Sequence, residues 1–254
     1  KRKCLNQQHF PFLAIALPVS VLKLRCMKTM NRIAILLMAG ASNRFSKQGT
    51  TEKQFIEIKG IPSFIYPLKS LISSSVFRKT IVVCASGKTE CVSNLIKEFT
   101  TIDSVAVIEG GNDRNASVKA ALDFIEQNYR NWIDSDSYVF IHDAARPCLP
   151  IDILTAINEQ CGKYDAIAPA IPLTDSITQN GNYIPRDNIL RVQTPQAFNL
   201  KQIISIYKSP FDKESTDDFS KAIKAGLSAK LIEGSPLLYK ITYPEDICLL
   251  EKIL

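Results

Sequence analysis

The sequence predicts an α/β fold in which a mainly parallel sheet is covered by helices on both faces. Three observations support this prediction. Short β-branched runs alternate with helical stretches from residue 32 onward, the first run is apolar without interruption, and small or charged residues follow directly after the strands. Uninterrupted apolar strands are typical of parallel sheets that are buried on both faces, and ligands bind beyond the carboxyl ends of such strands.

The predicted elements alternate along the first two thirds of the chain. Apolar and β-branched runs predict strands at 33–38, 80–85, 104–108, 138–142 and 166–171. Apolar residues at helical spacing predict helices at 64–72, 90–99, 117–128 and 151–161. Each helix thus connects two strands, which is the connection that parallel strands require.

This alternation is interrupted at about 173–193, where Asn180-Gly181 predicts a hairpin turn between two short strands. We therefore expect an inserted arm of the kind that packs on a second subunit. Further elements follow it: helices at 200–207 and 217–225, a strand at 238–241, and a last helix opened by Pro244-Glu245-Asp246. One domain with an inserted arm, over 30–254, accounts for the whole pattern.

The net charge of +6 is confined to the beginning of the chain. Six basic residues occur in 1–29, no acidic residue occurs before Glu52, and the remaining 25 basic residues equal the 25 acidic ones in number. The domain itself is therefore neutral, and its composition does not point to nucleic acid or a membrane as a partner.

Residues 1–29, called the leader below, superficially resemble a secretory signal because an apolar run follows basic residues. Small residues at a cleavage site are missing, and the run at 10–22 is shorter than the roughly 20 residues that span a bilayer. We expect upstream translated sequence or a disordered extension, with a basic amphipathic membrane tether as the alternative.

Seven scattered cysteines without Cys-x-x-Cys predict reduced thiols in a cytoplasmic protein, with neither disulfides nor a zinc site.

Three segments that follow strands contain candidate functional residues. The first begins with the small-residue loop after Met38 and contains Arg44, with Lys53 nine residues further on. Small residues let backbone N–H groups approach phosphate oxygens, and the two bases supply charge. The second runs from Gly110-Gly111 to Ser117, where paired glycines permit close contact with a flat ligand. A solvated loop and a helix-capping turn are the respective structural alternatives.

The third segment is His142-Asp143-Ala144-Ala145-Arg146-Pro147. An acid at the end of a central strand can hold a divalent cation or a substrate hydroxyl, while the nearby arginine faces an anion. A structural salt bridge between the two is the alternative. This segment alone does not separate these interpretations.

The order of the three segments resembles the 2-C-methyl-D-erythritol 4-phosphate cytidylyltransferases, enzymes of non-mevalonate isoprenoid biosynthesis. The resemblance covers 32–254 and continues through Thr174-Asp175-Ser176, Pro185-Arg186, Gln193-Thr194-Pro195-Gln196, Thr216-Asp217-Asp218 and Lys240-Ile241-Thr242. It implies a single Rossmann-like domain of the nucleotidyltransferase type, CTP and a polyol phosphate as substrates, Mg²⁺ as cofactor, and a homodimer formed through the arm.

The resemblance also implies roles for individual residues. Contacts to the nucleotide are implied for Met38, Ala39, Gly40, Ala41, Gly111, Asn112, Ser117 and Ala144. Charge stabilisation during catalysis is implied for Arg44, Lys53 and Lys240. Binding of the acceptor is implied for Asp143, Arg146, Ser176, Arg186 and Thr216, with Ser176 and Arg186 reaching the partner subunit's site and Asp143 also beside the metal.

The chain departs from the family pattern at Met38, Asn43, Glu52 and Asn112, which concerns nucleotide affinity more than reaction type. The expected reaction is attack of a phosphate monoester on the α-phosphorus of CTP, which needs no general base. Three alternatives stay open: a ribitol-5-phosphate cytidylyltransferase, another sugar-phosphate nucleotidyltransferase or glycosyltransferase, and a nucleotide-binding module without catalysis.

Overall fold

The computed structural model describes residues 31–39, 55–101, 103–209 and 217–254. Asn31–Leu254 belong to one compact unit. Several sequence predictions lie outside the described residues: the leader, and the site residues Gly40, Ala41, Arg44, Lys53 and Thr216. None of the described helices is both long enough and apolar enough to cross a membrane.

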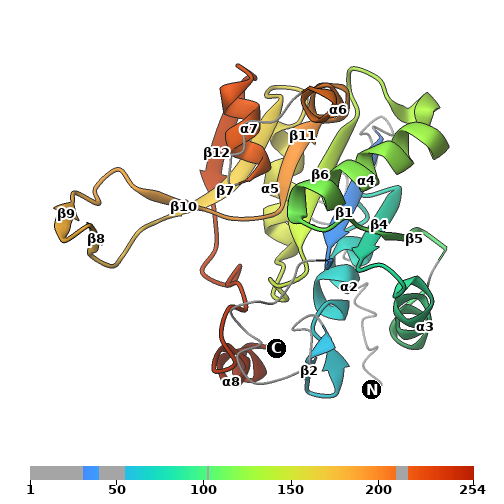
Figure 1. Ribbon diagram of the computed structural model, residues 1–254, viewed down its shortest axis with the longest axis horizontal. Coiled ribbons are helices and arrows are strands. Elements are labelled where there is room, and N and C mark those ends of the chain that lie inside the picture. Colours follow the sequence, from blue (N-terminus) through green and yellow to red (C-terminus); the bar gives the residue numbers. More distant parts are fainter. Residues whose placement is uncertain (1–30, 40–54, 102, 210–216) are drawn as a thin grey trace, which may run out of the picture. The chain divides into compact units, whose positions relative to one another are not determined.

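The main sheet has the strand order β10-β7-β11-β6-β1-β4-β5, and β12 pairs with β7 (Figure 1). Its strands are β1 (Arg32–Leu37), β4 (Lys79–Cys84), β5 (Val105–Glu109), β6 (Tyr138–Asp143), β7 (Ala166–Pro172), β10 (Leu190–Val192), β11 (Gln196–Asn199) and β12 (Ala229–Glu233). The pairs β6–β1, β1–β4, β4–β5 and β7–β12 are parallel, whereas β10 and β11 run antiparallel to their neighbours. The predicted fold class is confirmed, with β10 and β11 as its antiparallel part.

Helices cover both faces of this sheet. They are α2 (Ile65–Ser73), α3 (Thr89–Phe99), α4 (Arg114–Asn128), α5 (Ile151–Gln160), α6 (Leu200–Lys208) and α7 (Asp218–Lys224). The terminal helix α8 (Asp246–Ile253) lies outside this sheet, where its Leu250 packs with Ile58. Successive side chains of β1 point to opposite faces, as strand geometry requires. Ala34 and Leu36 pack with α2, α3 and α5, whereas Ile33 and Ile35 pack with α4, α6 and α7. The apolar run of β1 is thus buried from both sides.

The inserted arm consists of β8 (Ile177–Gln179) and β9 (Asn182–Ile184), and it extends away from the main sheet in Figure 1. Asn180 and Gly181 both have positive φ angles, 51° and 82°, as the predicted hairpin turn requires. The chain returns through β10, which pairs antiparallel with β7 at the base of the arm. A second small hairpin, β2 (Glu57–Ile58) with β3 (Ile61–Pro62), was not predicted.

The strand predicted at 238–241 is wrong. Leu238 and Ile241 are buried, but their backbone N–H groups bond to Ser235 and Ala145, so this segment does not pair along a neighbouring strand. The strand in this part of the chain is β12, which is only partly buried and includes Lys230 and Glu233. Its apolar pattern is weak because it lies beside β7 without burying both faces, whereas the pattern at 238–241 reflects burial of an irregular segment.

Candidate active site

The three predicted segments meet at the carboxyl ends of β1, β5 and β6. Met38 continues the sheet by donating its N–H to the carbonyl of Val83 at 2.9 Å, and Ala144 donates to the carbonyl of Leu37 at 2.9 Å. Ala39 lies against the glycine pair, because a Cβ placed on Gly110 would come within 2.8 Å of the Ala39 Cβ. The N–H groups of Met38 and Ala144 are therefore engaged within the protein, and both residues are buried.

The glycine pair is required by close packing against the start of α4. A Cβ on Gly110 would lie 2.7 Å from Ser117 Oγ, and one on Gly111 would lie 2.3 Å from the Ala116 Cβ. Ser117 Oγ accepts from the N–H of Gly111 at 3.2 Å and donates to the carbonyl of Asp113 at 2.8 Å. Ser117 therefore holds the loop on the helix, and Asn112 beside it is exposed.

The start of α4 differs from the prediction. The helix begins at Arg114, three residues before the predicted start, because Asp113 caps it by accepting from the N–H of Ala116 at 2.7 Å. Arg114 is consequently the first residue of the helix, and the first turn fixes its backbone. The sequence left open whether Ser117 caps this helix or bonds a ligand, and the observed cap is Asp113.

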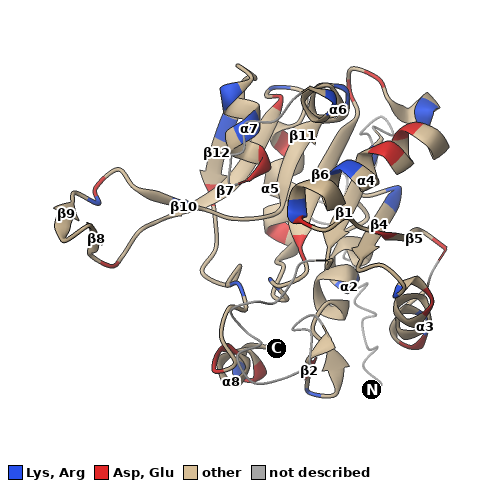
Figure 2. Cartoon of the chain, viewed as in Figure 1, with Lys and Arg blue, Asp and Glu red and all other residues tan. Residues whose placement is uncertain are grey.

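Figure 2 shows basic and acidic residues distributed together over the domain. Asp143 is the centre of a cationic cluster. Its Oδ2 lies 2.6 Å from Lys240 Nζ and its Oδ1 lies 3.4 Å from Arg114 Nε. Burial would raise the pKa of Asp143, but the charges of Arg114 and Lys240 outweigh burial and hold this pKa well below its ordinary value. Asp143 is therefore a carboxylate at neutral pH, close to two cations that are distant from it in sequence.

Arg114 was not predicted as a site residue. Its Nη1 lies 2.7 Å from Asp218 Oδ2, so the guanidinium joins Asp143 to the first turn of α7. Asp218 is fully buried and also accepts from the hydroxyl of Tyr207, while Lys221 Nζ lies 3.5 Å from its other oxygen. The signal in the sequence was the arginine that follows Gly-Gly together with the acidic pair Asp217-Asp218, but only the fold shows that these segments meet.

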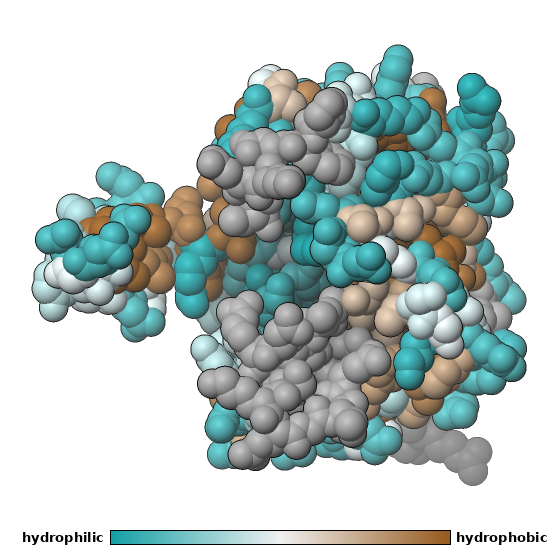
Figure 3. Space-filling view, in the orientation of Figure 1, coloured by the Kyte–Doolittle hydropathy of each residue, from teal (hydrophilic) through white to brown (hydrophobic). Residues whose placement is uncertain are grey.

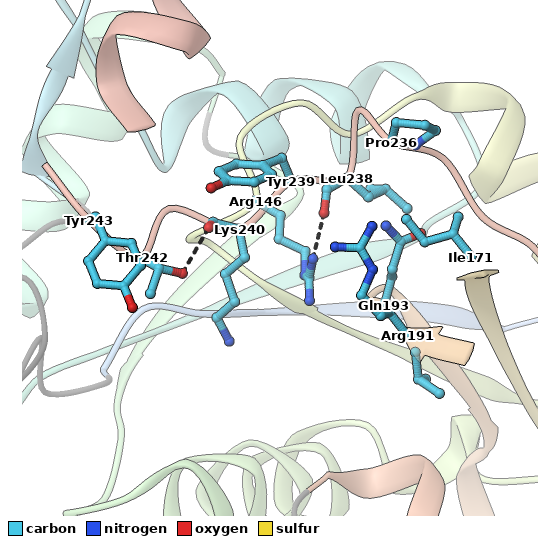
Figure 4. A pocket seen from close by; sticks show the side chains of 11 residues that line it. Arg146, Ile171, Arg191, Gln193, Pro236, Leu238, Tyr239, Lys240, Thr242 and Tyr243 are labelled. Atoms are coloured by element: carbon cyan, nitrogen blue, oxygen red, sulfur yellow. Dashed lines mark hydrogen bonds between the residues drawn. The ribbon is translucent and has the colours of Figure 1, made fainter. Parts of the chain in front are cut away.

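A pocket of about 260 Å³ lies beside this cluster (Figure 4). Its charged lining residues are Arg146, Arg191 and Lys240, without an acidic residue, and Tyr239 and Tyr243 contribute aromatic surface. Arg146 donates through Nη1 to the carbonyl of Leu238, and its buried Nε has no hydrogen-bond partner among the described residues. Arg191 was missed by sequence reasoning, because a single base on a short edge strand carries no signal of its own.

The pocket is suited to an anion with several polar atoms. In Figure 4 the side chains of Arg146 and Lys240 point toward the same open space. Burial lowers the pKa of Arg146, partly offset by Asp143, yet an arginine stays protonated at neutral pH. Hydrophilic residues also line the hollow at the centre of the face shown in Figure 3. A guanidinium group that lines such a space can bind phosphate oxygens.

Ser176 and Arg186 do not join this cluster within one chain. Both are exposed on the arm, and neither lines the pocket. Arg186 donates to the carbonyl of Thr174, which links the two sides of the arm. The structure therefore brings together Met38, Ala39, Gly111, Ser117, Asp143, Ala144, Arg146 and Lys240, and leaves Ser176 and Arg186 apart from them.

Comparison with known proteins identifies the family. The sequence model of the 2-C-methyl-D-erythritol 4-phosphate cytidylyltransferases matches residues 32–254, almost the whole described unit. The chain belongs to this family. The resemblance noted in the sequence is thus confirmed, and the match begins, as expected, after the leader.

Relatives of known sequence and structure agree with this assignment. The chain is 31% identical over 219 residues to a 2-C-methyl-D-erythritol 4-phosphate cytidylyltransferase of Thermotoga neapolitana, covering 85% of this chain and 93% of that protein. It is 34% identical to a bifunctional IspD/IspF enzyme of Pelagibacter ubique, covering 86% of this chain but 56% of that protein. The crystal structure of the Francisella tularensis IspD enzyme superposes with a TM-score of 0.71 at 25% identity, covering 88% of this chain and all of that one.

Proposed function

We propose that this chain transfers the cytidylyl group of CTP to 2-C-methyl-D-erythritol 4-phosphate, releasing pyrophosphate and forming 4-diphosphocytidyl-2-C-methyl-D-erythritol. Family membership supports the reaction. The observation that carries the acceptor site is the pocket whose charged lining residues, Arg146, Arg191 and Lys240, are all basic. A phosphate monoester is the part of the acceptor that matches this chemistry.

In this proposal the protein's residues align the acceptor phosphate with the α-phosphate of CTP and neutralise the negative charge of both groups. Arg146, Arg191 and Lys240 would bind the acceptor phosphate, whose dianion is a competent nucleophile without a general base. Lys240 Nζ lies 2.6 Å from Asp143 Oδ2, so binding of a substrate phosphate would draw this ammonium group from the carboxylate to phosphate oxygens. Arg114 would then remain as the cation that holds Asp143.

The nucleotide would lie over the loop that follows β1. We assign the triphosphate to the backbone of Ala39, Gly40 and Ala41, since the N–H of Met38 is already bonded to Val83. Arg44 and Lys53 would stabilise charge on the α-phosphate. Gly111, Asn112, Ser117 and Ala144 would contact cytosine and ribose. Thr216 would complete the acceptor pocket. The convergence of Met38, Gly111 and Ala144 at one edge of the sheet supports this arrangement.

Asp143 fits the role of Mg²⁺ ligand. No group of three or more metal-binding side chains occurs in the part of the chain that the structure describes. Mg²⁺ is commonly bound by one or two carboxylates together with substrate phosphates, so a single ionised carboxylate at this place is sufficient. When bound, the ion would neutralise charge on phosphate oxygens.

We further propose a homodimer in which the arm completes the partner subunit's site through Ser176 and Arg186. The exposure of both residues and of Tyr183, which is 80% exposed, supports an interface on the arm. A native mass of about twice 28.3 kDa is expected from light scattering, and a monomer at working concentration would contradict the proposal.

Free buried thiols at Cys84 and Cys161 agree with a cytoplasmic location.

Pyrophosphate release tests the reaction. Purified protein with CTP and Mg²⁺ should release pyrophosphate with 2-C-methyl-D-erythritol 4-phosphate, and faster than with ribitol 5-phosphate. The Lys53→Ala variant should lose about 100-fold or more in turnover, the magnitude for loss of one transition-state donor. Lys97→Ala, an exposed lysine on α3, serves as the control and should retain full turnover. A preference for ribitol 5-phosphate, or unchanged turnover in Lys53→Ala, would contradict the assignment.

A further inference from the structure

The turn between β10 and β11 and the first residue of β11 form the motif Gln193-Thr194-Pro195-Gln196, to which the reaction assigns no role and which is called the turn below. Its polar side chains are buried: Gln193 is 5% exposed, Thr194 4% and Gln196 1%. Buried polar side chains are stable only when they are hydrogen-bonded, and each of these three bonds to a different segment of the candidate site. The motif is therefore a junction between segments that are distant in sequence.

Thr194 holds the segment from His142 to Arg146. Its Oγ1 accepts from the backbone N–H of Asp143 at 3.2 Å and lies 3.1 Å from His142 Nδ1. His142 Nε2 lies 3.1 Å from the carbonyl of Arg146, which can only accept, so Nε2 carries the proton and Nδ1 accepts from the Thr194 hydroxyl. One hydroxyl thus fixes the backbone of Asp143 and, through the imidazole, that of Arg146.

Gln193 holds the segment that carries Lys240. Its Nε2 donates to the carbonyl of Ser235 at 2.8 Å, and its Oε1 accepts from the Ser235 N–H at 3.1 Å. The neighbouring Gly234 is packed tightly against this amide, because a Cβ on Gly234 would lie 2.2 Å from Gln193 Oε1 and 3.1 Å from the backbone of Ala170. Both backbone groups of Ser235 are therefore fixed by one side chain, five residues before Lys240.

Gln196 holds the start of α7. Its Nε2 donates to Asp217 Oδ2 at 2.9 Å, and its Oε1 accepts from the N–H of Phe219 at 3.1 Å. The residue between these two contacts is Asp218, which pairs with Arg114. The three side chains of the turn consequently fix three groups of site residues relative to one another.

We propose that the turn from Gln193 to Gln196 is the positioning element of the active site, and that Gln193 sets the place of Lys240 relative to Asp143 and Arg146. Gln193 lines the pocket but acts through Ser235, so it is a positioning residue in this inference. Its kinetic consequence rests on the proposed function, since Lys240 is assigned to the substrate phosphates. Its structural consequence, order in the segment 234–241, does not.

The test compares two variants that disturb the same contact by different means. Gln193→Met keeps the length of the side chain and removes both hydrogen bonds, whereas Gly234→Ala forces the amide away. Both should lower kcat/KM for the acceptor at least tenfold, while the Kd for CTP measured by calorimetry changes less than twofold. Both should also increase backbone hydrogen exchange in 234–241, where Ile241 donates to the carbonyl of Ala145.

Asn199→Ala is the matched control. Asn199 is a buried amide at the end of β11 that donates to the carbonyl of Ser135 and caps α6, so its loss should lower Tm without changing kcat/KM or exchange in 234–241. Equal kcat/KM and equal exchange in Gln193→Met and Asn199→Ala would overturn the inference. If the wild-type protein released no pyrophosphate, the proposed function would fail, and the exchange comparison would still decide the positioning role.

Discussion

The Arg114→Met substitution tests the ion-pair network behind the site. It leaves the fully buried Asp218 with Lys221 at 3.5 Å as its nearest cation, in place of a guanidinium nitrogen at 2.7 Å. Removing one partner of a buried pair costs about 3–5 kcal/mol. Because Lys221 offsets part of this cost, we expect the lower value of about 3 kcal/mol. For a chain of this size the corresponding fall in Tm is about 6–12 °C.

Differential scanning calorimetry measures this effect against a control on the same helix. Lys119→Met breaks the exposed pair with Asp123, which should change the free energy of unfolding by about 0.5 kcal/mol or less. Adding Asp218→Asn to Arg114→Met removes the orphaned carboxylate, so the double variant should be more stable than the sum of the single effects. Equal Tm values for the Arg114 and Lys119 variants, or strict additivity, would refute the reasoning.

Three further predictions concern the same region. Burial lowers the pKa of His142 to about 4, so below its ordinary value of 6.5 the unfolded chain binds a proton that the folded chain does not. The free energy of unfolding should therefore fall by up to about 3 kcal/mol between pH 6.5 and 4, and urea titrations of His142→Gln should show a smaller fall. Gly111→Ala places a Cβ 2.3 Å from the Ala116 Cβ and should destabilise the fold by about 1–3 kcal/mol in thermal unfolding. Arg146→Lys replaces the planar guanidinium that lines the pocket, and it should raise the acceptor KM at least tenfold in the pyrophosphate assay. An unchanged KM would show that this guanidinium does not bind the acceptor.

Local signals carried most of the fold prediction. The apolar runs that became β1, β4 and β6 and the helical spacing of α2 and α3 are properties of short segments, and the Asn180-Gly181 turn has its own backbone requirement. The failures have equally local causes. At 238–241 the apolar pattern recorded burial of an irregular segment, and at β12 an edge position left too little apolar pattern to detect.

Only some residues of the candidate site could be predicted from the sequence. Asp143, Arg146 and the glycine pair could be selected from sequence, because each follows a strand whose carboxyl end faces the ligand in this fold class. Arg114 and Arg191 could not be selected from sequence, because their importance comes from neighbours that are far away in sequence. Arg114 pairs with Asp218, and Arg191 lines the pocket together with residues of other segments.

The sequence by itself determined the alternation of strands and helices, the inserted arm, the neutral domain behind a basic leader and the family to which the chain belongs. Those properties follow from residue types and short spacings. Only the tertiary structure decided which side chains form ion pairs and which partners the buried polar groups of Gln193, Thr194 and His142 meet. It alone shows that Arg146 Nε has no hydrogen-bond partner among the described residues. Hydrogen bonds and ion pairs depend on distances of a few ångströms between segments, and such distances exist only once the chain has folded.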